Sequence, residues 1–329
     1  MSKYRPLKVS SVTAETDEIS VYELVDMDGM ELPAFTAGAH IEIAFTQDLV
    51  RHYSLCNDPG ERHRYVIAVK LERQGRGGSL FMHERIGVGT ILRNWKLGNS
   101  FDLDESGAHY ILIAGGVGIT PIMSMMKRLE ALDRPYTLHY CAKSEDKAAF
   151  RASLLQGEHA GRVRFHYSRS RARNGDQHGG QDDATMRWNA ADALSAADAG
   201  TQVYCCGPGS LISSVRQATT SWPAGTVHME FFSAASSLSA QGAETFSVKI
   251  AKSGDVYPVP PDRTILQVLR QHGLHVESTC EAGACGTCQV RYLDGTPDHR
   301  DLYLTEAEQS EFIMVCVSRS KTPCLTLDL

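Results

Sequence analysis

The chain has 329 residues, of which 42% are hydrophobic and 22% are charged, and its formal net charge is −6. This length predicts two or three domains, and the composition is that of an ordinary globular protein. The acidic balance argues against a general binder of nucleic acids or anionic membranes. We expect no signal peptide, because the first residues lack an apolar run, and no membrane span, because no segment approaches roughly 18 apolar residues.

The N-terminal third has the pattern of a series of short strands. Residues 7–12, 19–24, 41–45 and 65–71 are the expected strands, and the turns Asp28-Gly29 and Ala37-Gly38 interrupt the first three. Many short strands with little helix predict a small antiparallel β-barrel.

Two motifs in this third have the residues to bind a phosphorylated ring compound. In Arg51–Ser54 (RHYS) the arginine can clamp a phosphate, the tyrosine can stack on a planar ring, and the serine can hydrogen-bond its edge. In Gly75–Ser79 (GRGGS) the glycines free backbone N–H groups, and the serine begins a predicted helix whose N-terminus favours phosphate. The alternatives are an edge-strand tyrosine and an ordinary turn.

The middle third changes to the strand–loop–helix–strand pattern of a nucleotide-binding unit. An apolar strand at 110–114 leads into the glycine-rich loop Gly115–Pro121 (GGVGITP), and the next strand covers 136–142. We expect Thr120 to cap the intervening helix and Pro121 to take its first position. The alternative is a merely tight connection between strand and helix.

A second strand of the middle third, 202–206, ends at Cys206-Gly207-Pro208. Ligands of α/β sheets bind beyond the carboxyl ends of the strands, so this segment and Gly115–Pro121 are expected to face one crevice. Cys205 should point the other way and serve packing. The alternative for Cys206 is a buried core thiol.

The last third is preceded by a small, polar segment, 233–243, which we expect to be a flexible linker. Strands at 246–251 and 256–259 form a predicted hairpin, a helix starts at Thr264, and Thr305 and Glu308 form a capping box at a second helix. This order predicts an α+β domain of the β-grasp type.

Four cysteines of this third have the spacing of a plant-type [2Fe–2S] site. Cys280, Cys285 and Cys288 follow the pattern C-x4-C-x2-C, and Cys316 is the better candidate than Cys324 for the distant fourth ligand. Small residues between them let the backbone approach the cluster sulfurs. The alternatives are a zinc site, which usually has paired CxxC or Cys/His ligands, and disulfides.

The order RxYSL, GxGGS, GGVGITP, CGP and CxxxxCxxC resembles the phthalate dioxygenase reductase family, which includes vanillate demethylase reductases. The resemblance covers essentially the whole chain. It implies an FMN-binding β-barrel at 1–105, an α/β nicotinamide domain with a parallel sheet at 106–232, the linker at 233–243 and a plant-type ferredoxin domain at 244–329. FMN rather than FAD agrees with the sequence, which has no obvious extra aromatic loop to stack an adenine.

The resemblance also implies the site residues. FMN would be held by Arg51, His52, Tyr53, Ser54, Val69, Lys70, Gly77, Gly78, Ser79, Thr120 and Phe232. NADH or NADPH would be held by Gly115, Gly116, Gly118, Thr120, Pro121, Ser168, Arg169, Cys206, Gly207 and Pro208. Cys206 and Glu230 would lie near the hydride path, and the alternative for Glu230 and Phe232 is a hydrophobic strand end.

The chain departs from the family at Ser168 and Arg169. NADH-using relatives often carry an acidic residue here, whereas a Ser-Arg pair resembles the 2′-phosphate site of NADPH-using ferredoxin reductases. The alternative is a solvated loop, so both NADH and NADPH stay open.

By resemblance, the expected function is a reductase that passes electrons from NAD(P)H through FMN and a [2Fe–2S] cluster to the Rieske centre of a separate oxygenase acting on an aromatic compound. The alternatives are a diiron hydroxylase or a cytochrome as acceptor, and a non-enzymatic ferredoxin carrier. We expect a monomer without nucleic-acid or membrane partners, located in the reducing cytoplasm, where spare thiols persist.

Overall fold

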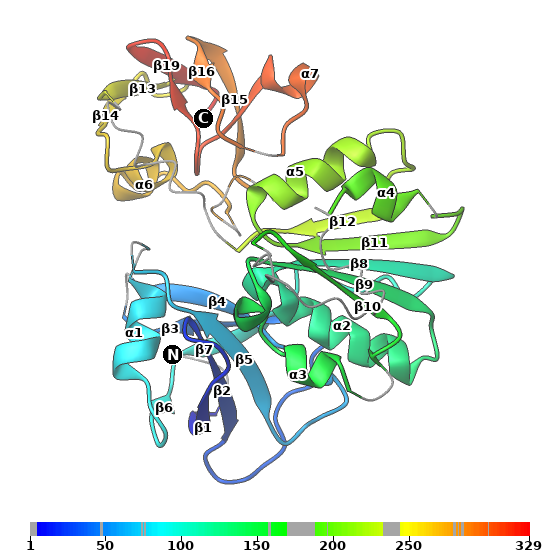
Figure 1. Cartoon of the computed structure of the whole chain (residues 1–329). Helices are drawn as coiled ribbons and strands as arrows, with labels where there is room; N and C mark the ends of the chain where they lie inside the picture. The colour runs from blue at the N-terminus through cyan, green and yellow to red at the C-terminus, as the bar shows by residue number, and fades with distance from the viewer. Residues whose placement is uncertain are drawn as a thin grey trace. The chain divides into compact units, whose positions relative to one another are not determined.

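The computed structural model describes residues 5–46, 49–73, 75, 77–156, 159–169, 188–195, 197–232, 244–278, 281, 283, 286–301 and 303–329. The chain divides into two compact units, Met1–Met229 and Glu230–Leu329 (Figure 1). Within the described ranges, no helix has the length and apolar character needed to cross a membrane. The predicted linker 233–243 lies outside the described residues.

The first unit begins with antiparallel strands that surround an apolar core. They are β1 (Leu7–Ala14), β2 (Ile19–Asp26), β3 (His40–Ala44), β4 (Val50–Ser54), β5 (Tyr65–Lys70), β6 (Ile91–Leu92) and β7 (Trp95–Gly98). They form one sheet of order β5-β2-β1-β6 and another of order β4-β3-β7. Alternate residues such as Leu7, Val9, Ile41 and Ile43 are buried in the shared core, as a period of two requires. The predicted antiparallel barrel is confirmed.

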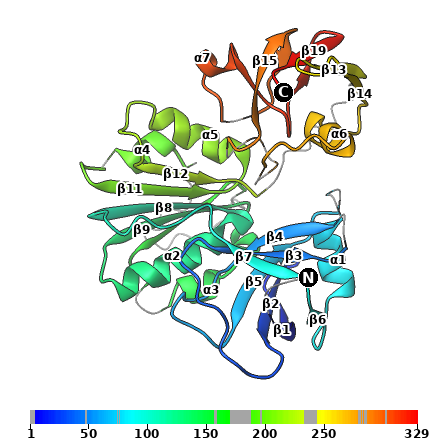
Figure 2. The same cartoon turned by 180° about the vertical axis from the view of Figure 1, so that it is seen from behind.

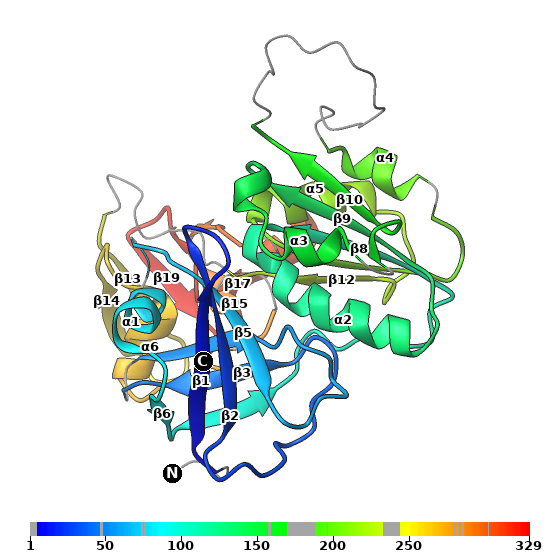
Figure 3. The ribbon, with the colours of Figure 1, turned by 60° about the horizontal axis from the view of Figure 1, so that its bottom comes forward.

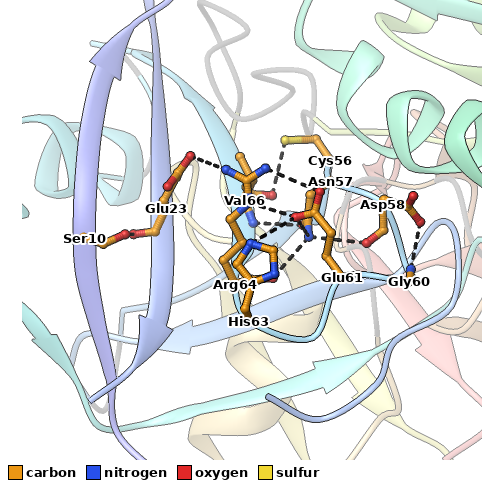
Figure 4. Close-up of polar contacts among 10 residues, drawn as sticks. All are labelled: Ser10, Glu23, Cys56, Asn57, Asp58, Gly60, Glu61, His63, Arg64 and Val66. Atoms are coloured by element: carbon orange, nitrogen blue, oxygen red, sulfur yellow. Dashed lines mark hydrogen bonds and ion pairs between the residues drawn. The ribbon is translucent and has the colours of Figure 1, made fainter. Parts of the chain in front are cut away.

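A polar network orders the loop between β4 and β5 (Figure 4). Arg64 Nη1 lies 2.6 Å from Glu23 Oε1, and Arg64 Nε lies 2.8 Å from Glu61 Oε2. The buried Asn57 side chain accepts from the Val66 N–H at 2.9 Å and donates to the Arg64 carbonyl at 3.1 Å. Because these bonds satisfy buried backbone groups, they define the start of β5, which leads to the glycine motif.

The rest of the first unit is a parallel sheet covered on both faces. Its strands are β8 (His109–Gly115), β9 (Tyr136–Ala142), β10 (Val163–Tyr167), β11 (Thr201–Cys206) and β12 (Val227–Glu230), in the order β10-β9-β8-β11-β12. Helices α2 (Ile119–Ala131) and α3 (Arg151–Leu154) cover one face, and α4 (Ala190–Leu194) and α5 (Gly209–Ala218) cover the other (Figure 3). Strand order reverses at β8, which pairs with both β9 and β11.

The start of α2 differs from the prediction. A 3₁₀ turn at Gly116–Gly118 precedes the helix, which begins at Ile119 with Gly118 in the capping position. Thr120 therefore lies inside the first turn, where its Oγ1 donates to the Val117 carbonyl at 3.1 Å. The expectation that Thr120 caps the helix is wrong, because the glycines allow the chain to coil two residues earlier.

The barrel and the parallel sheet share buried residues. Phe101 and Leu103, which follow the barrel strands, belong to the core cluster that contains Tyr204 of β11. The Tyr204 hydroxyl accepts from the Asp104 N–H at 2.6 Å and donates to the Asp102 carbonyl at 3.2 Å. These contacts join the two predicted N-terminal domains into one compact unit, and the border at 105/106 stays a prediction.

The second unit is a mixed sheet with one main helix (Figure 2). Its strands are β13 (Phe246–Ile250), β14 (Val256–Val259), β15 (Gln289–Asp294), β16 (Pro297–Asp298), β17 (Phe312–Met314), β18 (Arg319–Ser320) and β19 (Cys324–Leu327). The main sheet has the order β14-β13-β19-β15-β17, with β13 and β19 parallel. Helices α6 (Ile265–Gln271) and α7 (Glu306–Gln309) both begin with a capping box, at Thr264 and Thr305. This is the predicted β-grasp pattern.

A buried arginine holds the entry of the chain into this unit. Arg319 is 3% exposed and donates to the carbonyls of Glu244, Val259, Pro260 and Arg263. Its guanidinium also lies 4.9 Å from the centroid of the Phe246 ring. The planar fork therefore satisfies several backbone carbonyls at once.

We expect Arg319→Lys to lower the free energy of unfolding of the second unit by about 2 kcal/mol, because an ammonium cannot replace the fork and leaves buried carbonyls unpaired. The measurement is a urea titration. Arg291→Lys is the matched control, since Arg291 is 53% exposed and pairs with Glu311 at the surface; its effect should stay within about 0.5 kcal/mol. Equal urea midpoints for Arg319→Lys and Arg291→Lys would contradict the stabilising role of the Arg319 guanidinium.

Candidate functional site

Strand β4 presents Arg51 and Tyr53 on one side. Tyr53 pairs with Ile41 and Arg51 with Ile43 across β3, and both isoleucines are core residues. The Tyr53 hydroxyl is fully covered and has no hydrogen-bond partner among the described residues, and burial raises the pKa of Tyr53. A buried hydroxyl in this state is the kind of group that a bound polar ligand would satisfy.

His52 and Ser54 lie on the other side of the strand, because side chains alternate. His52 Nε2 is 2.9 Å from Glu42 Oε2, and the ring stacks on His40 with centroids 4.7 Å apart. The structure therefore directs the His52 side chain away from Arg51 and Tyr53, with which it was grouped in the sequence.

The two N-terminal motifs meet at helix α1 (Gly78–Arg85). A β-carbon on Gly78 would lie 2.4 Å from Arg51 Cγ, so the Arg51 side chain passes directly over the start of the helix. Gly77 caps the helix with φ of 82°, and among the described residues no side chain caps its first N–H groups. Ser79 Oγ accepts from the Glu72 N–H at 3.0 Å. A guanidinium beside a helix N-terminus fits a phosphate group.

Val69 and Lys70, which are also predicted to bind FMN, end β5 just before the glycine motif Gly75–Ser79. Val69 is buried, and Lys70 forms an ion pair with Glu72. Gln74, just before the glycine motif, and Arg76, within it, lie outside the described residues.

In the parallel sheet, the glycine loop packs backbone to backbone on the end of β11. A β-carbon on Gly118 would lie 2.3 Å from the Cys206 carbonyl oxygen, and one on Gly115 would lie 2.5 Å from Pro208 Cδ. A β-carbon on Gly207 would lie 2.9 Å from Gly115 Cα. The structure thus brings Gly115–Pro121 and Cys206–Pro208 together at the carboxyl ends of the strands, where nucleotides bind.

The loop after β10 runs beside the end of β9, so that the backbones of Lys143 and Arg169 are hydrogen-bonded neighbours. The Ser168 N–H donates to the Ala142 carbonyl at 3.1 Å, and the Arg169 N–H donates to the Lys143 carbonyl at 2.9 Å. Lys143 follows β9 and Arg169 follows β10, so both lie at the carboxyl edge of the sheet. The sequence analysis missed Lys143, because only the parallel register of β9 and β10 makes it a neighbour of Arg169.

Glu230 ends β12, the neighbour of β11, at the border between the two units. Its Oε2 is fully covered and has no hydrogen-bond partner in the described part of the chain, although the residue as a whole is half-buried. Burial raises the pKa of Glu230 to about 8. Phe232, two residues later, is 39% exposed.

In the second unit, Cys288 and Cys316 are 1% and 3% exposed and lie on neighbouring segments. The N–H of Val315 donates to the Cys288 carbonyl at 3.3 Å, which brings the two cysteines to one place. Cys280 and Cys285 lie outside the described residues, and no group of three metal-ligating side chains occurs among those that are described. Cys324 lies in β19, between β13 and β15, with register partner Ser247.

The loop before Cys288 has the tight backbone that a cluster requires. Gly283 and Gly286 have φ of 73° and 80°, values that favour glycine. A β-carbon on Gly283 would lie 2.6 Å from Val317 Cγ2, and one on Gly286 would lie 2.4 Å from the Tyr303 ring. Gly283 is therefore pressed against the residue that follows Cys316 and Gly286 against Tyr303, and such a close backbone fits a [2Fe–2S] group.

Two domain families match the chain. Residues 112–217 match the oxidoreductase NAD-binding domain, and residues 248–321 match the 2Fe-2S iron-sulfur cluster binding domain. The fold and these matches define an oxidoreductase that combines a nicotinamide-binding domain with a plant-type ferredoxin domain.

The chain is also similar over almost its full length to known reductases. It is 44% identical to the phthalate 4,5-dioxygenase oxygenase reductase subunit of Pseudomonas putida, over 98% of this chain and 96% of that one. It is 43% identical to the tert-butanol monooxygenase / tert-amyl alcohol desaturase reductase subunit of Aquincola tertiaricarbonis, over 98% and 95%. A solved phthalate dioxygenase reductase, described as a modular structure for electron transfer from pyridine nucleotides to [2Fe-2S], superimposes with a TM-score of 0.76 and 38% identity, covering 99% and 98% of the two chains.

The chain belongs to the phthalate dioxygenase reductase family. Its function is therefore that of a reductase component in an oxygenase system, with an oxygenase as electron acceptor. The predicted iron–sulfur and nicotinamide cofactors are confirmed at the level of the domains.

The buried Glu230 carboxyl predicts a pH dependence of stability. Its pKa in the folded protein, about 8, lies above the unfolded value, so the stability it contributes is present below the unfolded pKa and is lost as pH rises through about 8. Between pH 6 and pH 9 we expect a loss on the order of 2 kcal/mol. Glu230→Gln should abolish this loss, as measured by urea unfolding at both pH values.

Glu311→Gln is the control for this measurement, since the Glu311 side chain is 50% exposed. It should keep the wild-type pH dependence. An identical fall in stability for wild type and Glu230→Gln would show that the carboxyl is not buried in the protein in solution.

Proposed function

We propose that this reductase passes electrons from NAD(P)H through FMN and its [2Fe–2S] cluster to the Rieske centre of a partner oxygenase. The observation that carries the flavin part is the contact of Arg51 with the start of α1, beside the unpaired Tyr53 hydroxyl. A nicotinamide gives two electrons together and a [2Fe–2S] cluster takes one, and bound FMN supplies the conversion between them. The chain's own residues bind, orient and shield the cofactors.

A single phosphate site supports FMN as the flavin. The uncapped N–H groups of α1 and the Arg51 side chain would hold the phosphate. Tyr53 would use its hydroxyl and ring on the flavin, and Thr120 would complete its surroundings. Val69, Lys70, Gly77, Gly78 and Ser79 would line the ribityl chain and phosphate.

The nicotinamide would lie in the crevice between Gly115–Pro121 and Cys206–Pro208. The close backbone packing of Gly118 on Cys206 keeps side chains out of the strand ends and leaves backbone N–H groups for the diphosphate. Cys206 is fully buried and would border the hydride path. Glu230, whose carboxyl holds its proton at neutral pH, would lie beside it.

The cluster would be held by Cys280, Cys285, Cys288 and Cys316. The contact between the Val315 N–H and the Cys288 carbonyl supports Cys316 as the fourth ligand. Cys324 lies on β19, an interior strand of the main sheet.

The acceptor is proposed to be a Rieske-type oxygenase acting on an aromatic compound. One relative serves a phthalate 4,5-dioxygenase and another a tert-butanol monooxygenase, so the family's oxygenases act on different compounds. We propose a monomer that works in the cytoplasm, in line with the absence of disulfides among the seven cysteines that the structure describes.

The test uses the purified holoprotein, which should contain FMN and two irons per chain and should reduce cytochrome c with NAD(P)H. Cys288→Ser should lose iron and at least about 90% of cytochrome c reduction, while it keeps FMN and reduces ferricyanide directly from the flavin. Cys324→Ser is the matched control and should keep its iron.

A holoprotein without FMN would overturn the flavin proposal. A Cys288→Ser variant with unchanged iron content would overturn the ligand set. A protein that carries the cluster but does not oxidise NAD(P)H would be an electron carrier instead.

The neighbouring cations Lys143 and Arg169 support NADPH as the preferred nucleotide, because a guanidinium and an ammonium together neutralise a 2′-phosphate. We expect Arg169→Asp to lower the ratio of kcat/KM for NADPH to that for NADH about tenfold. Arg164→Asp makes the same charge change at an exposed position of β10 and should leave the ratio unchanged. A ratio that is equal in wild type and Arg169→Asp would retire this phosphate site.

A further inference from the structure

Helix α6 is tied to the cluster loop by one side chain. Arg270, in the last turn of α6, donates from Nη1 to Glu281 Oε1 at 2.6 Å and from Nη2 to the Ser278 hydroxyl. The Ser278 hydroxyl in turn donates to Glu281 Oε1 at 3.2 Å. Ser278 and Glu281 lie two residues before and one residue after Cys280 in the sequence. Arg270 thus holds the chain on both sides of a proposed cluster ligand.

The same helix is also fixed to the other side of the ligand set. Its apolar residues, including Ile265 and Leu269, are fully buried in the core of the second unit. The Leu266 N–H donates to the Val315 carbonyl at 2.9 Å, and Val315 precedes Cys316. Because α6 is anchored in the core, Arg270 extends from a rigid support to a loop that must wrap around the cluster.

The contact also stabilises an unusual backbone conformation. Glu281 has φ of 48°, in the left-handed region that residues other than glycine seldom adopt. Such a conformation is strained and persists only where neighbours hold it. The hydrogen bond and ion pair with Arg270 help to hold Glu281 in this conformation.

We propose that Arg270 is a positioning residue that holds the Cys280 side of the cluster loop and offsets the charge of Glu281, so that it sets the reduction potential of the cluster. This inference rests on the proposed ligand set. Reduction adds negative charge to the loop region, which a guanidinium favours and a carboxylate opposes. In the Arg270–Glu281 pair, the opposite effects of the two charges on the reduction potential nearly cancel.

The charge part is tested on the full-length holoprotein by spectroelectrochemistry. Arg270→Gln leaves the Glu281 carboxylate unbalanced, so the midpoint potential of the cluster should fall, by about the 59 mV that corresponds to a tenfold change in a one-electron equilibrium. Glu281→Gln should raise it, and the double variant should return close to wild type. Arg291→Gln removes a charge from the same unit at an exposed ion pair and should leave the potential unchanged.

The positioning part is tested by the rate at which a chelator removes iron. Arg270→Lys keeps the charge and loses the two-point hold, so it should keep the potential but release iron several-fold faster than wild type. If the Arg270→Gln variant does not take up a cluster, the Arg270→Lys variant decides the positioning part of the proposal. Iron release from Arg270→Lys at the wild-type rate would overturn the positioning role. An unchanged potential in a loaded Arg270→Gln would overturn the charge role. Absence of a cluster from the wild type would instead overturn the proposed function.

Discussion

The close packing of the glycine loop on the end of β11 is the constraint on which the first unit depends. Gly118 approaches the Cys206 carbonyl so closely that a β-carbon would overlap it. Because of this contact, the chain can coil through the 3₁₀ turn Gly116–Gly118 into α2 close to the end of β11. A nucleotide that binds there meets backbone N–H groups rather than side chains.

A comparable constraint operates on the barrel, where Arg51 crosses Gly78 at the start of α1. The glycine is needed because the arginine occupies the space of its side chain. The first unit therefore has two close approaches that need glycine, one between β4 and α1 and one on the parallel sheet, and a shared core joins the two parts. In a reductase of this family, that common core supports both steps of the electron path that precede the cluster.

Several features of the fold and site were predictable because they depend on short stretches of sequence. The capping box at Thr305 formed as expected, since cap and partner are three residues apart, and the helix predicted to start at Thr264 begins with a capping box as well. Cys288 and Cys316 were predicted from spacing. The start of α2 was not, because a threonine followed by proline competes there with glycines that let the helix begin earlier. The motif Arg51–Ser54 was not predicted correctly as one group, because side chains alternate along β4 and His52 and Ser54 point to the other side from Arg51 and Tyr53.

The sequence by itself determined the order of the domains, the local motifs and the cysteine spacing, because each of these is written in residues that are near neighbours in the chain. Only the tertiary structure decided which distant residues meet. Lys143 reaches Arg169 through the parallel register of β9 and β10, and Arg270 reaches Glu281 because α6 is anchored in the core. Register and packing depend on the whole set of buried side chains at once, so short-range patterns do not specify such contacts.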